Sequence, residues 1–291
     1  MMSELKVKVD DRARLVTAVL AASQWPDEEQ AQLTHAVHPH AKQTRQFVSK
    51  FSNHPAVVGM NQSWLNGVEL DTMFSAAARC QWPTFITSPR EALPRVLQIE
   101  GWTQSLAQFA KDSKIATEFW PQHEAVWDAA TAALRTIFPN DNLLTFIDRI
   151  TGNPIKQTVI IMPNLVYPAL SPILATGNQQ YYLLVPPPKA VGESPPWPYS
   201  EDPGWVVALA SRQLLQNAFG EDLSKLEDEQ AKIVIHAATT LCLEELLDEF
   251  EGQAYLLRRL KEEKLPTLPD AVEQMRDYIA KDGPKSISDL F

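Results

Sequence analysis

The stretch FWPQHEAVWDAA, residues 119–130, contains a histidine followed directly by a glutamate. In an HExxH helix, two histidines four residues apart bind one zinc ion, and the glutamate between them acts as general base on the zinc-bound water. Here the position four residues after His123 is Trp127, which has no ligand atom. Trp127 instead begins an apolar stripe at helical spacing that continues through Leu134. The pattern predicts a helix that starts at Pro121 with Trp127 in the core, and it disfavours a metal site.

The other histidines offer a second possible source of metal ligands. Three of them, His35, His38 and His40, fall within HAVHPH, but no Cys, Asp or Glu occurs between residues 30 and 68 to complete a site. A solvent-exposed helix end is the favoured interpretation, and His54, which precedes a proline, is expected to close a turn. The alternative is a metal-dependent hydrolase that uses these non-motif histidines. It requires three or more imidazoles within about 5 Å of a common point.

Three carboxylates, Glu244, Asp248 and Glu251, recur at spacings of four and three residues. On one helix they would share a face and could bind a cation or a basic partner. So many acids surround them that a solvated helix face is the favoured interpretation. No GxSxG stretch is present to supply a serine nucleophile.

The charge of the chain is concentrated in its second half. The 291 residues are 45% hydrophobic and 21% charged, which is ordinary globular composition, and the formal net charge is −10. Residues 1–120 carry 12 basic and 12 acidic side chains, so residues 121–291 carry the whole net charge. This balance argues against nucleic acid or an anionic membrane as partner. It leaves open a regulatory binder of a basic protein through the acidic helices at 221–263.

The two cysteines and the first residues of the chain indicate the cellular compartment in which the protein is expected. Cys80 and Cys242 are far apart in apolar surroundings, so two buried thiols are expected rather than a disulfide, as is typical of a reducing cytoplasm. The first residues, MMSELKVKVDD, lack the apolar core of a signal peptide, and no run of 18 apolar residues exists. We therefore expect a cytoplasmic protein with no membrane-spanning segment.

Hydrophobic periodicity predicts a mostly helical α+β chain with a small mixed or antiparallel sheet. Strands are expected at 5–10, 157–166 and 179–188, with a turn region at 168–178 and an irregular loop at 186–203. Helices are expected at 12–23, 27–37 (capped by Asp27), 41–53, 93–113, 121–138, 203–219, 226–249, 251–263 and 265–279. The expected division is 1–156, 157–281 and a polar tail at 282–291, within one continuous globular unit.

Several of these stretches resemble an uncharacterised bacterial family of predicted zinc peptidases, gluzincin-like, with an HEFSH-type motif. The similar stretches are VKVDDRARLVTAVLAAS, FVSKFSNHPAVVGMNQSW, WTQSLAQFAKDSKIATEFWPQHEAVWDAA, QTVIIMPNLV, QQYYLLVPP and the segment from IVIHAATTLCLEELLDEF to MRDY. The HPAV segment and the order of the elements are the most specific points of similarity. The resemblance implies a zincin-like fold.

The same resemblance implies that the zinc site has been lost. The family's zinc helix corresponds to DPGWVVALASRQLLQNAF, 202–219, which contains no histidine or glutamate. Its third ligand falls near Lys232, and an ammonium group cannot bind zinc; Glu229 would need a shift of one helical turn. We therefore expect no catalytic residues, metal or cofactor, and a pseudo-enzyme that binds another protein or a peptide. The residues expected at the remaining groove are Trp205, Ala208, Arg212, Lys232 and His236.

Overall fold

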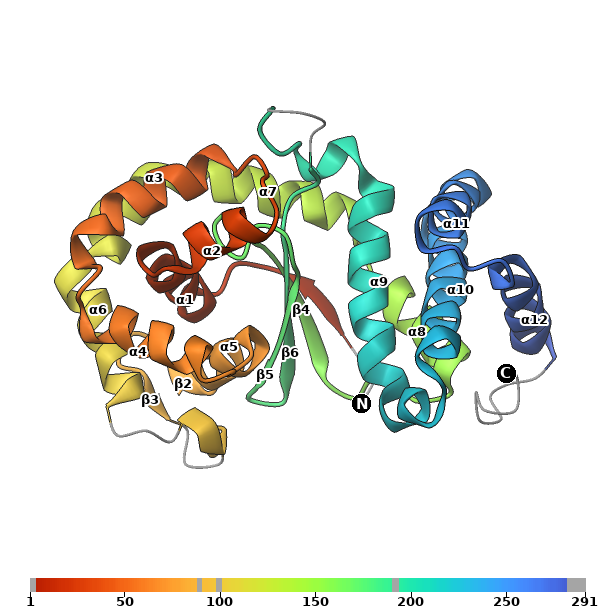
Figure 1. The fold of residues 1–291 in the computed structure, drawn as a ribbon, viewed down its shortest axis with the longest axis horizontal. Coiled ribbons are helices and arrows are strands. Elements are labelled where there is room, and N and C mark those ends of the chain that lie inside the picture. The colour runs from red at the N-terminus through yellow and green to blue at the C-terminus, as the bar shows by residue number, and fades with distance from the viewer. Residues whose placement is uncertain (1–3, 88–90, 98–100, 190–193, 282–291) are drawn as a thin grey trace. The chain divides into compact units, whose positions relative to one another are not determined.

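The computed structural model describes residues 4–87, 91–97, 101–189 and 194–281 (Figure 1). The expected α+β class with predominant helix and a small mixed sheet is confirmed. None of the helices in the described part of the chain combines the length and apolarity needed to cross a bilayer. Contacts divide the chain into two compact units that do not follow chain order. A helical unit comprises Met1–Leu5, Ile137–Thr158 and Asp202–Phe291, and a sheet unit comprises Lys6–Thr136 and Val159–Glu201.

The sheet has four strands in the order β1-β4-β6-β5. Their bounds are Leu5–Val7, Thr158–Pro163, Gln180–Val185 and Ile173–Gly177 for β1, β4, β6 and β5. β5 and β6 form an antiparallel hairpin with Ile173 opposite Leu184. Asn178 and Gln179 make its two-residue turn with positive φ angles of 52° and 58°, which matches the twist of the flanking strands. The expected turn region at 168–178 is therefore wrong over its second half, where β5 lies.

α1 (Asp11–Ala22) is the central helix of the sheet unit. Asp10 caps it by accepting a hydrogen bond from the backbone N–H of Arg12 at 3.0 Å. Ten of its 12 residues are buried, because helices surround it on several sides (Figure 1). The surrounding elements are α2 (Trp25–Gln32), α3 (Pro39–Val48), η1 (Ser49–Phe51), α4 (Pro55–Leu65), α5 (Leu70–Ala78) and α6 (Trp102–Ser113).

Several expected helix bounds need correction. α2 begins at Trp25 after Gln24, so Asp27 is in its first turn and is not its cap. The expected helix over 41–53 begins two residues earlier, at Pro39, and ends in a short 3-10 turn. The expected helix over 93–113 is wrong in its first half, where only the 3-10 turn η2 (Arg95–Leu97) forms before α6; residues 98–100 lie outside the described residues. The remaining pair, β2 (Cys80–Gln81) and β3 (Ile86–Thr87), forms a short antiparallel ladder.

The segment that contains HEAVW is helical throughout but changes type twice. η3 (Ile115–Phe119) is a π-helix, η4 (Trp120–His123) is a 3-10 helix, and α7 (Glu124–Ile137) is an α-helix. Trp127 is only 2% exposed. This confirms that the aromatic ring at the fourth position after His123 belongs to the core.

The helical unit is built around α10 (Asp228–Leu246). Every residue from Ile233 to Leu243 in this helix is buried, because α8 (Asn142–Thr151), α9 (Pro203–Phe219), α11 (Glu249–Glu263) and α12 (Leu268–Ala280) all pack against it. A 3-10 turn, η6 (Gly220–Lys225), joins α9 to α10, and η5 (Tyr199–Glu201) precedes α9. The four helices expected after residue 203 are confirmed, and the tail expected at 282–291 lies outside the described residues.

Candidate functional site

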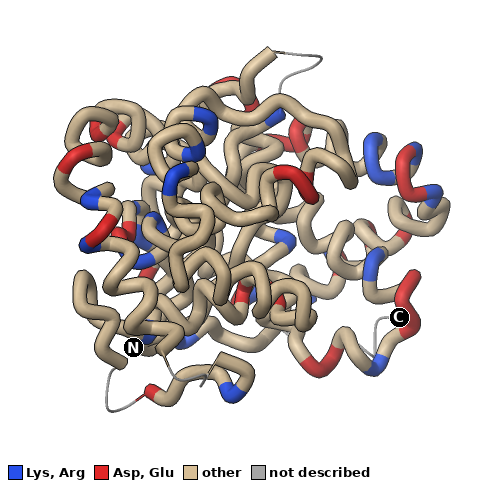
Figure 2. Tube along the Cα trace, turned by 60° about the vertical axis from the view of Figure 1, so that its left-hand side comes forward, with Lys and Arg blue, Asp and Glu red and all other residues tan. Residues whose placement is uncertain are grey.

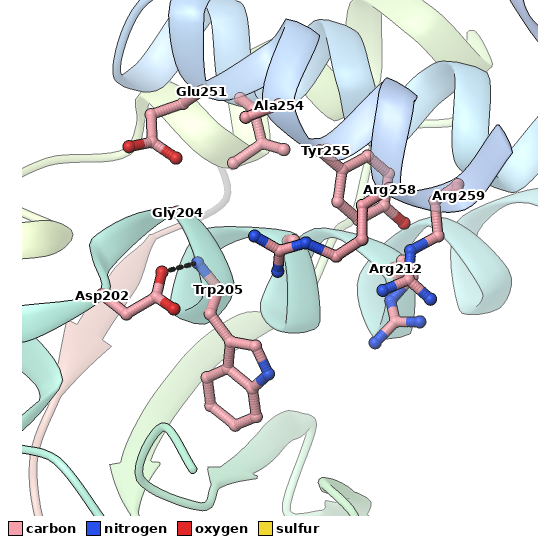
Figure 3. Close-up of a pocket in the computed structure, with 11 residues that line it drawn as sticks. Asp202, Gly204, Trp205, Arg212, Glu251, Ala254, Tyr255, Arg258 and Arg259 are labelled. Carbon is pink, nitrogen blue, oxygen red and sulfur yellow. Dashed lines mark hydrogen bonds between the residues drawn. The ribbon is translucent and has the colours of Figure 1, made fainter. Parts of the chain in front are cut away.

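A small pocket lies in the helical unit between α9 and α11 (Figure 3). Its volume is about 40 Å³, and a cavity holds one water once it offers about 10–15 Å³. The pocket can therefore accept a few waters or one small functional group. It is lined by Asp202, Gly204, Trp205, Ala208 and Arg212 from the start and middle of α9, by Leu243 from α10, and by Glu251, Ala254, Tyr255, Arg258 and Arg259 from α11.

α9 supplies one wall because its first turn is fixed by a side-chain cap. The Asp202 carboxylate accepts a hydrogen bond from the backbone N–H of Trp205 at 2.8 Å, and Pro203 occupies the first helical position. Trp205, Ala208 and Arg212 then follow at spacings of three and four residues, which places them on one face of the helix. The opposite faces are apolar and buried.

α11 supplies the other wall of the pocket, and its first turn is also fixed by a side-chain cap. The Asp248 carboxylate accepts a hydrogen bond from the backbone N–H of Glu251 at 2.9 Å and caps the helix. Glu251, Tyr255 and Arg258 then recur at spacings of four and three residues and face the pocket. Arg259, the next residue, lies beside the Tyr255 ring with its guanidinium carbon 5.4 Å from the ring centre.

The end of the pocket at the start of α9 is acidic. Glu251 lies directly against Gly204, at the place that a side chain at that position would occupy. Burial raises the pKa of Glu251, and the nearby carboxylates of Asp202 and Asp248 raise it further, while Arg258 acts in the opposite direction. Glycine at position 204 thus allows a carboxylate to approach the positive end of the α9 dipole.

The other end of the pocket is basic, and its cations are unequally paired. Arg259 donates to Glu263 at 3.0 Å and lies 3.1 Å from a carboxylate oxygen of Glu262. Arg212, by contrast, has no hydrogen-bond or ion-pair partner among the described residues, and its Nε atom is buried. Arg258 likewise forms neither a hydrogen bond nor a close ion pair with any described residue, although Glu251 is near it. The pocket therefore presents two guanidinium groups with unused donors.

Tyr255 is connected to a buried histidine behind the pocket. The Nδ1 atom of His236 is 2.7 Å from the Tyr255 hydroxyl, and its Nε2 atom is 3.2 Å from Glu263. Burial lowers the pKa of His236, against the opposing effect of Glu263, so the ring is neutral at pH 7. A neutral ring that donates from Nε2 to the Glu263 carboxylate must accept at Nδ1, so the Tyr255 hydroxyl donates to it. Burial raises the pKa of Tyr255 to about 12, although Arg212 and Arg259 act in the opposite direction.

Three of the five groove residues expected from the sequence, Trp205, Ala208 and Arg212, meet at this pocket. His236 lies behind Tyr255 and does not itself line the pocket, and Lys232 is also absent from the lining. The α11 residues that face α9 were not expected from the sequence. A signal was present, because Glu251, Tyr255, Arg258 and Arg259 fall within one short segment at helical spacing.

Two histidines cap helices. His38 Nδ1 accepts a hydrogen bond from the backbone N–H of His40 at the start of α3, and His54 Nδ1 accepts one from Ala56 at the start of α4, both at 3.1 Å. His54 was expected to close a turn; it instead caps the start of a helix. His35 lies on the chain between α2 and α3, with Nδ1 2.7 Å from the carbonyl oxygen of Leu33. The second ring nitrogen of His35 lies 3.7 Å from Glu29, and that of His54 lies 3.5 Å from Asp112.

His40 is part of a buried aromatic cluster. It is 2% exposed, and its Nε2 atom accepts a hydrogen bond from Trp127 Nε1 at 2.9 Å. The His123 ring lies 5.3 Å away between ring centres, and His123 Nδ1 is 2.9 Å from the carbonyl oxygen of Phe119. The expectation of a solvent-exposed helix end is therefore wrong for His40, and also for His35, whose side chain is only 5% exposed. Among the residues that the structure describes, no three His, Cys, Asp or Glu side chains are placed so that they could share a metal ion.

The expected solvated face of three carboxylates is also wrong. Glu244 lies on α10 and pairs with Arg276 of α12 at 2.9 Å, Asp248 caps α11, and Glu251 faces the pocket. They do not share one helix. Figure 2 shows acidic and basic positions interspersed along the described trace. The two cysteines are free and buried, as expected, and burial raises the pKa of the Cys242 thiol to about 12, so it is not activated.

A second, more open pocket of about 500 Å³ lies in the sheet unit. It is lined mainly by neutral polar side chains from the end of α1, from η1 and from α4. Its charged groups, Arg45 and Asp27, pair with each other at 2.7 Å. This self-paired lining contrasts with the α9–α11 pocket, in which guanidinium groups are left without partners.

Comparison with known proteins gives no relative from which a function could be transferred. No family model, no curated protein and no solved structure matches this chain.

Proposed function

We propose that this chain is a non-catalytic, zinc-peptidase-like protein that acts as a protein-binding scaffold or accessory subunit. In this proposal the zincin-like frame is retained and a segment of another protein binds at the α9–α11 pocket. The observation that carries it is the lining of that pocket, to which α9 contributes Trp205 and Arg212 and α11 contributes Tyr255 and Arg258. Trp, Tyr and Arg are the residues most enriched among those that dominate the energetics of protein interfaces.

The size of the pocket favours a protein segment over a free small molecule. Sites for drug-sized ligands enclose about 300–1,000 Å³ and cover most of the ligand. This pocket offers about 40 Å³, enough for one functional group. A peptide can place a single side chain or terminus in it and leave the remainder of the segment on the surface. We therefore propose a cytoplasmic protein or peptide partner and no nucleic acid.

The chemistry of α9 supports the non-catalytic part of the proposal. Between Pro203 and Phe219 the helix has no His, Cys, Asp or Glu, which are the side chains that bind zinc in proteins. The alternative of a hydrolase that uses the other histidines has less support, because those rings cap helices or pack in the core. The alternative of a basic partner also has less support, because Glu244 and Glu263 are paired with arginines and Asp248 caps α11.

Selection from a random peptide display library tests the proposal. The full chain is the target, and the double variant Trp205→Ala/Arg212→Met is compared with a matched control, Trp197→Ala/Arg149→Met, which removes the same residue types elsewhere. We expect enriched peptides to bind the wild type and the control alike and to lose at least about tenfold in affinity on the pocket variant. Peptides that bind all three proteins equally would refute the assignment of the binding site.

A further inference from the structure

We propose that the group held in the α9–α11 pocket is a carboxylate, bound by Arg212 and Arg258. This inference rests on the proposed function and names the chemistry of the bound segment. Arg212 is the starting point, since its Nε atom is buried without a partner and no described residue forms a hydrogen bond or ion pair with it. A buried donor without an acceptor destabilises the fold, and more so in a charged group, so an acceptor from a ligand would be strongly favoured here.

The other polar groups of the pocket cannot satisfy Arg212 from within. Glu263 and Glu262 are engaged by Arg259. The Tyr255 hydroxyl lies 2.7 Å from His236 Nδ1 and forms no hydrogen bond with Arg212. Asp202 accepts from the backbone of Trp205, and Glu251 lies against Gly204 at the other end of the pocket. Arg212 and Arg258, from facing helices, therefore remain as lining guanidinium groups without a partner among the described residues.

The balance of charge selects the kind of anion. Arg259 is paired with Glu262 and Glu263, so the rest of the lining carries two arginines and two carboxylates, Asp202 and Glu251, and is formally neutral. A carboxylate adds one negative charge beside the unpaired guanidinium groups, whereas phosphate at about −2 would bring a second charge close to the two acids. A carboxylate is planar, accepts two parallel hydrogen bonds from a guanidinium, and fits a volume of about 40 Å³.

A carboxylate on a protein segment has two sources, an acidic side chain and a free C-terminus. Both present the same two oxygens, so the pocket chemistry is shared between them. The two sources differ in the backbone of the bound segment. The backbone ends at a C-terminal carboxylate, whereas it continues in both directions beside an acidic side chain.

NMR spectra of the full chain with isotopically labelled arginine test the inference, because each Nε–Hε signal reports directly on one guanidinium group. The variant Arg212→Gln identifies the signal of Arg212 by its loss.

The probes are sodium acetate, inorganic phosphate and three acetylated tetrapeptides: Ala-Ala-Ala-Leu as free acid, the same peptide as amide, and Ala-Ala-Glu-Leu as amide. We expect acetate and at least one carboxylate peptide to shift the Arg212 signal saturably, with the neutral amide at least about tenfold weaker. The comparison of the free acid with the glutamate peptide identifies the source. The exposed Arg149 signal should stay unchanged as the matched control.

Three results would overturn the inference: equal binding of the acid and the amide, phosphate binding tighter than acetate, or equal shifts at Arg149 and Arg212. The first leaves a peptide site that does not select carboxylates, so the proposed function would survive. The reverse pattern, in which acetate shifts Arg212 and no peptide does, supports the carboxylate site and contradicts the binding of protein segments.

Discussion

At the scale of single residues, the pocket is defined by polar groups that the fold leaves without partners. Arg212 is half-buried on α9 and has no acceptor among the described residues. Arg12, on α1, carries the same guanidinium group, but all of its nitrogens are used: it hydrogen-bonds Asp10, the Tyr182 hydroxyl and the backbone carbonyl oxygens of Ala78 and Cys80. The contrast distinguishes an arginine that holds the structure together from one available to a ligand.

This contrast predicts opposite effects of the same substitution. Arg212→Met should not lower the free energy of unfolding. It should raise it by between zero and about 3 kcal/mol, because the substitution removes a buried donor that has no partner. Arg12→Met should lower it by about 3–5 kcal/mol, because Asp10 loses its buried partner. Urea unfolding followed by circular dichroism measures both. A large destabilisation by Arg212→Met would show that this side chain has a structural partner.

His40 makes stability depend on pH. Burial, together with the charges of His123, His38 and Arg14, lowers its pKa from 6.5 to about 3. Between those pH values the unfolded chain takes up a proton at this residue and the folded chain does not, so acidification favours unfolding. Between these pH values the free energy of unfolding falls by about 1.4 kcal/mol for each pH unit. His40→Gln keeps an acceptor for Trp127 and cannot titrate.

The expected result is that the wild type loses more stability than His40→Gln as the pH falls from 6.5 towards 4, while the two converge in slope above pH 7. Denaturant unfolding at a series of pH values measures the difference. Parallel curves for the two proteins over the acidic range would contradict the buried, neutral state of His40.

At the scale of elements, close packing between β5 and α5 predicts a sharp difference between two glycines. A Cβ atom at Gly177 would lie 2.8 Å from the backbone carbonyl carbon of Ala78, which cannot move aside easily. Gly177→Ala should therefore destabilise the fold by about 1–3 kcal/mol. Gly59, within α4, has no atom within 4 Å of such a Cβ, so Gly59→Ala should stabilise by about 0.5–1 kcal/mol. Thermal unfolding of both variants distinguishes the two signs.

The elements that the sequence predicted well are those with strong local patterns. The helix at 12–23, the strands at 157–166 and 179–188 and the helices after 203 are all present within a few residues. No helix is expected from the sequence where α4 lies, because proline after His54 is typical of a helix end, whereas proline also suits the first turn of a new helix. β5 was missed because its segment follows two prolines and ends in Thr-Gly-Asn, and its pairing with β6 supplies what local propensity lacks.

The sequence predicts the α9 side of the candidate site but not the α11 side. The α9 residues were found because a family resemblance pointed to that helix, and they do lie on one face. The α11 wall depends on which helix packs against α9, and this is a long-range fact that periodicity does not contain. The pairing state of each arginine is equally non-local, because the partners of Arg259 and the absence of a described partner for Arg212 arise from the packed arrangement.

At the scale of the whole molecule, we expect a protein that carries no zinc. Elemental analysis of the purified full chain should give far less than one zinc per chain, and a chelator should leave its melting temperature unchanged, because a structural zinc site would contribute directly to folding. One zinc per chain that is lost in a His123→Ala variant, together with a lowered melting temperature after chelation, would contradict the non-catalytic interpretation.

The main proposal is that the chain holds a segment of another protein at the α9–α11 pocket and leaves it intact. Hydrogen–deuterium exchange by mass spectrometry of the full chain, with and without a peptide selected on it, tests this most directly. We expect slower exchange at the first half of α9 and along α11, with the peptide recovered uncleaved in the same spectra. Protection confined to other elements, or a hydrolysed peptide, would contradict the proposal.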